Sequence, residues 1–120
     1  MAEKLKSRKT IQQLFKEGKT FSDPPLRILY LDSKEDLDYL KAAFSVSTKN
    51  FKKATDRNRI KRLMRESYRL QKPSLQAMLK KLNKRLSIFI IYTANTLPEY
   101  EYIYAKMGEI LSRLEKLISQ

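Results

Sequence analysis

Residues 54–71 read ATDRNRIKRLMRESYRLQ, and this segment determines both the expected fold and the expected surface chemistry. At about 100° per residue, a helical period sorts its side chains into two arcs. The basic arc contains Arg57, Asn58, Lys61, Arg62, Arg65 and Arg69. The apolar arc contains Ile60, Leu63, Met64, Ser67 and Leu70. We therefore expect a helix with one face in the core and the basic arc turned away from it.

The basic arc includes a ladder of like charges at i,i+4 spacing, Arg57, Lys61, Arg65 and Arg69. An ordinary solvated helix, the alternative interpretation, mixes signs because like charges at this spacing repel. The ladder therefore indicates a polyanion that neutralises it. Arg59 lies outside the basic arc, and we expect Glu66 to pair with Arg59 or Arg62. Asp56 is expected to be the N-cap of the helix.

Composition supports the same conclusion. The 120 residues carry 26 Lys and Arg against 13 Asp and Glu, a net charge of +13. Ten of the basic residues lie between Lys49 and Lys72, so the charge is concentrated in one patch. The length predicts a single domain over 1–120, with residues 1–9 flexible, and the charge predicts a polyanionic partner.

Missing residue types exclude several classes of enzyme. The chain has no cysteine and no histidine, which removes disulfides, thiolate nucleophiles, imidazole acid–base pairs and the usual transition-metal ligands. No apolar run approaches the ~18 residues of a membrane span, and the first residues lack the apolar core of a signal peptide. We expect a cytoplasmic protein without a membrane partner.

The remaining periodicities predict an α+β domain with a three- to four-stranded sheet covered by helices. The expected elements are a short helix containing Ile11, Leu14 and Phe15, strands at 26–32 and 40–48, a helix restarted after Pro73, a strand at 86–93, and a final helix opened by a capping box at 96–99. The first two strands are expected to form an antiparallel hairpin. The strand at 86–93 is apolar on both faces and is expected to be central. Phe15 could belong to the core or to an RNA-facing surface.

Residues 57–66, RNRIKRLMRE, preceded by AFSVS at 43–47 and FKKATD at 51–56, carry a family resemblance. The pattern resembles the signature of the protein subunit of bacterial ribonuclease P, and the resemblance covers nearly the whole chain. One departure is Lys52, near which many members have glycine. The resemblance implies a small α/β sandwich of order αβββαβα, like the second domain of ribosomal protein S5. It also implies that the central helix lies in a left-handed βαβ crossover, although general rules favour the right hand.

The resemblance also implies the function. The protein is expected to be the non-catalytic subunit of an endoribonuclease holoenzyme, in which the catalytic RNA subunit removes the 5′ leader of precursor tRNA. It is expected to be inactive without that RNA and to have no catalytic residue, metal ligand or organic cofactor of its own. Mg²⁺ is expected to be held mainly by the RNA.

Two RNA-binding sets follow from the same resemblance. The set expected to bind the catalytic RNA is Arg57, Asn58, Arg59, Lys61, Arg62, Arg65, Lys52 and Lys53. The set expected to bind the leader is Phe15, Tyr30, Lys49 and Phe51, which would combine aromatic stacking with a cation.

Two alternatives remain open at this point. A small ribosomal or other structural RNA-binding protein is equally basic and equally lacks catalytic groups. A DNA-binding module would read the major groove with the central helix. Only Asn58 on the basic arc suits base-edge readout and no helix-turn-helix partner is nearby, so DNA is not the expected partner.

Overall fold

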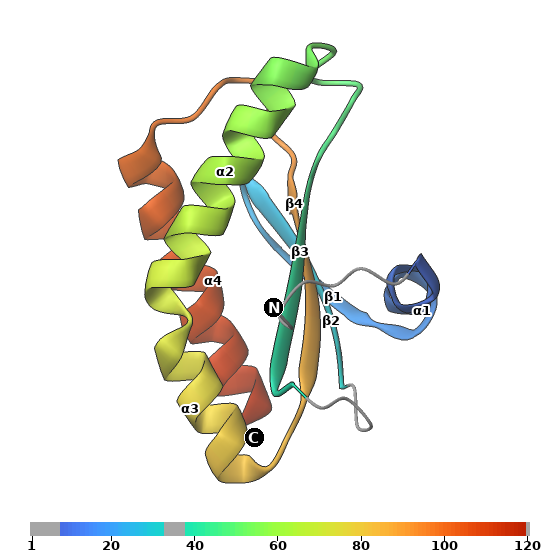
Figure 1. Ribbon diagram of the computed structural model, residues 1–120, viewed down its shortest axis with the longest axis vertical. Helices are drawn as coiled ribbons and strands as arrows, with labels where there is room; N and C mark the ends of the chain where they lie inside the picture. The colour runs from blue at the N-terminus through green and yellow to red at the C-terminus, as the bar shows by residue number, and fades with distance from the viewer. Residues whose placement is uncertain (1–7, 33–37, 120) are drawn as a thin grey trace.

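The computed structural model describes residues 8–32 and 38–119 (Figure 1). The elements are α1 (Arg8–Glu17), β1 (Lys19–Asp23), β2 (Leu26–Asp32), β3 (Leu40–Val46), α2 (Ala54–Gln71), α3 (Pro73–Leu82), β4 (Leu86–Tyr92) and α4 (Tyr100–Ile118). This order confirms the predicted α+β class, with α2 and α3 as the helix that Pro73 interrupts. Of the segment 1–9 that was expected to be flexible, residues 1–7 lie outside the described residues, whereas residues 8 and 9 form the start of α1.

The four strands form one mixed sheet in the order β1-β2-β4-β3. Strand β4 is central as predicted, antiparallel to β2 and parallel to β3. The predicted hairpin of β2 with β3 is wrong, because β2 pairs with β1 and β4 instead. Since β4 is apolar on both faces, a place between two other strands buries more of it than an edge would.

The helices cover the two faces of the sheet unequally. In Figure 1, α2, α3 and α4 form a layer on one face, while α1 lies alone on the other. Helices α2 and α3 connect the parallel neighbours β3 and β4. With the helical layer to the left of the sheet and β3 in front of β4, a connection from the upper end of β3 to the lower end of β4 is left-handed. This is the hand that the family resemblance implies.

The main core lies between the sheet and the three-helix layer. Its strand residues include Ile28, Ile88 and Ile90, each fully buried. Helix α4 contributes an apolar stripe at helical spacing, Ile103, Met107, Ile110, Leu111, Leu114 and Ile118. The burial of these aliphatic side chains provides most of the driving force for the fold.

The buried face of α2 is rotated from the predicted apolar arc. Ile60, Met64 and Ser67 are buried as expected, but Tyr68 is buried as well and Leu70 is 50% exposed. The Tyr68 ring packs edge-on against Phe44 of β3, with ring centroids 5.4 Å apart. An aromatic ring buries more area than leucine, so this contact determines which face of α2 meets the sheet.

The predicted side-chain caps are absent from two helix starts. Helix α4 begins at Tyr100 with Glu99 as N-cap and no side-chain cap bond, so the predicted capping box at 96–99 is wrong. Instead, the Thr96 carbonyl accepts a 2.7 Å hydrogen bond from the Tyr92 hydroxyl. In α2 the N-cap is Lys53, and Asp56 lies inside the first turn, where its charge favours the positive end of the helix dipole.

Candidate RNA-binding surface

The outer side of α2 presents four exposed polar side chains, Asn58, Arg59, Arg62 and Arg65, which we call the basic face. Among the residues that the structure describes, no carboxylate forms an ion pair with these arginines. The opposite side of the helix is anchored in the core by Ile60 and Met64. The basic face is therefore a rigid, positively charged surface whose guanidinium groups are available to phosphates. Lys61 lies at its edge and is half-buried.

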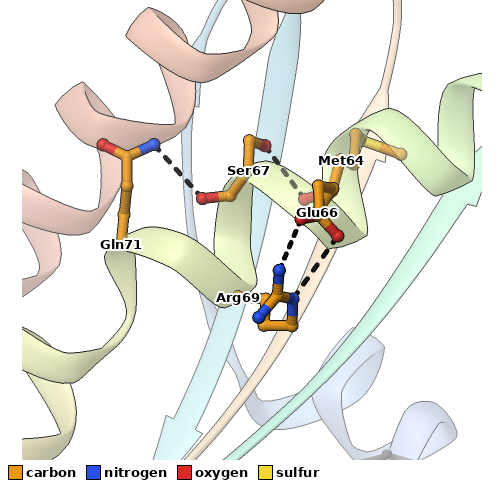
Figure 2. Close-up of polar contacts among 5 residues, drawn as sticks. All are labelled: Met64, Glu66, Ser67, Arg69 and Gln71. Atoms are coloured by element: carbon orange, nitrogen blue, oxygen red, sulfur yellow. Dashed lines mark hydrogen bonds and ion pairs between the residues drawn. The ribbon is translucent and has the colours of Figure 1, made fainter.

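Arg69 extends the ladder of like charges but is neutralised within the helix (Figure 2). Its Nη2 donates to Glu66 Oε1 at 2.5 Å and its Nε donates to Oε2 at 3.4 Å. The predicted pairing of Glu66 with Arg59 or Arg62 is therefore wrong. The hydrogen bond from Arg69 lowers the pKa of the Glu66 carboxyl, so the pair stays charged at neutral pH. We conclude that Arg69 contributes less to the basic face than its position suggests.

Arg57 is turned away from the basic face toward the loop between β3 and α2. Its Nη1 donates to the Phe51 and Lys52 carbonyl oxygens, both at 2.8 Å. The side chain is half-buried against this loop. The Arg57 side chain is therefore bonded to the backbone of the preceding loop. The arginines of the basic face form no ion pair with a described carboxylate.

The loop over residues 47–53 is well anchored. The Asn50 side-chain amide donates to the carbonyls of Thr93 at 3.0 Å and Ala94 at 3.3 Å. The Phe51 amide donates to the Ser47 carbonyl at 3.1 Å. Lys52 needs no glycine, because Asn83 is the one non-glycine residue with positive φ in the described part of the chain. Lys49, Lys52 and Lys53 are all exposed on this loop.

The sheet face opposite the three-helix layer is only partly covered. Because Ile88 and Ile90 point into the main core, strand alternation turns Ser87, Phe89 and Ile91 to the other side. By the same alternation and register, Ala43 and Ser45 of β3 lie beside Phe89 and Ile91. We call this the open sheet face. On this face Ala43, Ser45, Phe89 and Ile91 are partly exposed, whereas Ser87 is fully buried.

Helix α1 places an aromatic pair on the open sheet face. The buried Leu14 anchors α1, and the neighbouring Phe15 is 55% exposed. The Phe15 ring contacts Phe89 edge-on, with ring centroids 5.6 Å apart. Phe15 is therefore an exposed aromatic residue and not a core residue. Phe89 was missed by sequence reasoning, although its alternation with Ile88 and Ile90 was a usable signal.

The four residues predicted to bind the leader are not brought together. Phe15 lies on the open sheet face and Lys49 is exposed near the end of β3. Tyr30 points to the opposite side of the sheet, where it packs against Phe21 with ring centroids 6.1 Å apart. Phe51 is only 7% exposed and packs on Tyr92 in the main core. A base needs a free ring face for stacking, so the position of Phe51 disagrees with its predicted role.

Within residues 8–32 and 38–119, no three His, Cys, Asp or Glu side chains gather in a group that could hold a metal ion. No helix in the same ranges is long and apolar enough to cross a membrane.

Comparison with known proteins gives consistent matches. Residues 1–115 match the family model described as Ribonuclease P. A ribonuclease P protein component of Porphyromonas gingivalis is 36% identical over 114 residues, which cover 94% of this chain and 83% of the relative. One from Chlorobium phaeobacteroides is 27% identical, covering 92% and 83%.

Solved structures agree at the level of the fold. The ribonuclease P protein from Thermotoga maritima superposes with a TM-score of 0.71 at 26% identity, covering 92% of this chain and 96% of that one. The Staphylococcus aureus protein gives a TM-score of 0.76 at 22% identity, covering 95% and 96%. At 22% identity, the similarity to the Staphylococcus aureus protein is evidence for the fold alone.

Proposed function

The chain belongs to the ribonuclease P protein family, and from this membership we propose how it takes part in the removal of the 5′ leader from precursor tRNA. It is a protein component of an endoribonuclease holoenzyme. In our proposal the basic face of α2 binds the catalytic RNA, and the open sheet face binds the single-stranded leader. This function is carried out in the cytoplasm. The ribosomal and DNA-binding alternatives draw no support from the comparisons.

The observation that carries the proposal is the two-sided character of α2. One side is fixed in the core by fully buried Ile60 and Met64, and the other presents Arg59, Arg62 and Arg65 to solvent. Guanidinium groups held by a rigid helix suit phosphate oxygens, which position an RNA without reading its sequence. Lys52 and Lys53 at the start of α2 extend the same surface.

The open sheet face suits an unpaired strand. The exposed Phe15 ring, supported by Phe89, offers a stacking platform for a base. Lys49, exposed beyond the end of β3, offers a cation for the backbone. Tyr30 and Phe51 support this region from the core side of the sheet instead of contacting the leader.

Magnesium belongs to the RNA in this proposal. Among the described residues, no three His, Cys, Asp or Glu side chains gather in one group. Phosphate oxygens of the catalytic RNA are the alternative hard ligands. The protein acts by binding RNA and by neutralising its charge.

Phe15→Ala tests the leader site. In the reconstituted holoenzyme, we expect about a tenfold weaker affinity for precursor tRNA, the size of one lost base–aromatic stack, and no change for tRNA without a leader. The measurement is the equilibrium affinity for both substrates. Leu82→Ala, which truncates another exposed apolar side chain at the end of α3, is the matched control. An equal loss for both substrates would show that Phe15 does not contact the leader.

Glu66→Gln tests the neutralisation of Arg69. Removing this exposed carboxylate frees the Arg69 guanidinium and reduces repulsion of phosphate, so we expect affinity for the catalytic RNA to rise about two- to fivefold. Filter binding at moderate salt measures the change. Glu17→Gln, on α1 across the sheet, removes the same charge and should leave affinity within error. A similar gain in both variants would attribute the effect to net charge alone.

A further inference from the structure

We propose that Arg57 is a positioning residue, which holds the loop over 47–53 between the two RNA-binding surfaces and does not itself neutralise a phosphate. This inference rests on the proposed function and assigns different roles to the arginines of α2. Arg59, Arg62 and Arg65 contact RNA, whereas Arg57 acts through the backbone of residues 51 and 52.

The Arg57 guanidinium bridges two backbone carbonyl groups of the loop. A single nitrogen, Nη1, has two hydrogens and donates to two successive carbonyl oxygens at 2.8 Å each. These carbonyls immediately precede the first turn of α2, and they belong to neither helix nor strand. Moving Nη1 to a phosphate would therefore leave both acceptors without this donor.

The loop is held from three directions, which makes it a defined structural unit. Arg57 holds it from α2, and the Asn50 amide ties it to the carbonyls of Thr93 and Ala94 after β4. The Phe51 ring anchors it in the main core against Tyr92, with centroids 6.1 Å apart. Loss of either polar anchor frees one end of the loop while Phe51 stays buried.

The loop matters because of its place and its charges. It leaves the end of β3, which borders the open sheet face, and leads directly into α2, which bears the basic face (Figure 1). Its exposed lysines, Lys49, Lys52 and Lys53, have no described ion-pair partner. A fixed loop therefore fixes the positions of three positive charges. These charges lie between the leader, which we place on the open sheet face, and the catalytic RNA, which we place on the basic face of α2.

The test separates the charge of Arg57 from its hydrogen bonds. Citrulline keeps the terminal NH₂ of arginine but is neutral, so it can still bond both carbonyls. In the reconstituted holoenzyme, Arg57→Ala should lower the affinity for leader-bearing precursor tRNA about fivefold, the size of one lost hydrogen bond. Citrulline at position 57 should restore most of that affinity. Asn50→Ala should reproduce the loss, and the two alanine changes together should cost less than the product of their separate effects.

Arg62 provides the matched control, because it lies on the basic face and has no described backbone partner. Alanine and citrulline at position 62 should weaken binding of the catalytic RNA equally, since the charge is what matters there. If citrulline at position 57 is as damaging as alanine, or if Arg57→Ala has no effect, the positioning role is refuted. Should Arg57→Ala fail to fold, citrulline at 57 and Asn50→Ala still decide the question. A wild-type holoenzyme that binds precursor and mature tRNA equally would refute the leader site itself, and the inference with it.

Discussion

Ile60→Ala is expected to lower the free energy of unfolding by about 2–5 kcal/mol, the range for truncating a fully buried aliphatic side chain. Ile60 is 0% exposed and belongs to the main core between α2 and the sheet. The lost methyl groups leave a cavity that neither the helix nor the sheet can close, because both are fixed by other contacts. Urea unfolding followed by circular dichroism measures the change.

Leu63→Ala is the informative comparison for Ile60→Ala. Sequence periodicity puts both residues in the middle of the apolar arc and predicts equal losses. The structure leaves Leu63 half-buried at the edge of the core. We therefore expect a cost of only about 1 kcal/mol for Leu63→Ala, in proportion to the smaller buried area. Equal losses for the two variants would mean that α2 is rotated from the orientation described here.

The combined change of Arg59, Arg62 and Arg65 to alanine is expected to weaken affinity for the catalytic RNA about 100-fold, at roughly 1 kcal/mol for each lost charge-assisted contact. The free protein should unfold at the same urea concentration or a higher one, because like-charge repulsion along α2 is relieved. If about six phosphates are neutralised in the wild type, affinity should fall with salt at a log–log slope on the order of −4 to −5. The triple variant should reduce that slope by about 2 to 3.

A matched triple change separates a specific surface from net charge. Lys80, Lys81 and Lys116 are exposed near the C-terminal ends of α3 and α4, so their replacement removes the same charge elsewhere. This variant should retain most of the affinity and most of the salt slope. If the two triple variants lose affinity equally, RNA binding depends on overall charge, and the basic face is not the site.

Local periodicity predicts single helices and strands better than it predicts which strands lie next to each other in the sheet. The central place of β4 follows from the side-chain pattern within one segment, and the structure confirms it. The basic arc predicted for α2 is confirmed at Asn58, Arg62 and Arg65, whereas Arg57 turns to the loop and Arg69 pairs with Glu66. The hairpin of β2 with β3 fails because alternation tells which residues share a face and not which strands are adjacent. Strand β4, which comes much later in the chain, is apolar on both faces and lies between β2 and β3, so each of them pairs with β4 instead of with the other.

In the candidate site as well, side-chain directions fixed within one helix are predicted and those fixed by tertiary contacts are not. Arg62 and Arg65 are exposed as the helical period predicts, because a helix fixes their directions locally. Arg59, which the period put outside the basic arc, is exposed as well. The directions of Arg57 and Phe51 depend on tertiary contacts with the loop over 47–53, which no period encodes. Tyr30 shares a strand face with Leu26 and Ile28, yet only the packed helices determine that this is the core side of the sheet.

The parallel pairing of β3 with β4 has a consequence for the order of assembly. Antiparallel β1 and β2 can close through a tight turn, but β3 meets β4 only after the whole of α2 and α3 has been traversed. Closing so long a segment costs chain entropy before any ladder bond repays it. We therefore expect β3, an edge strand paired only with β4, to dock late in folding. RNA bound to α2 and to the loop after β3 would then hold in place a strand that joins the sheet late.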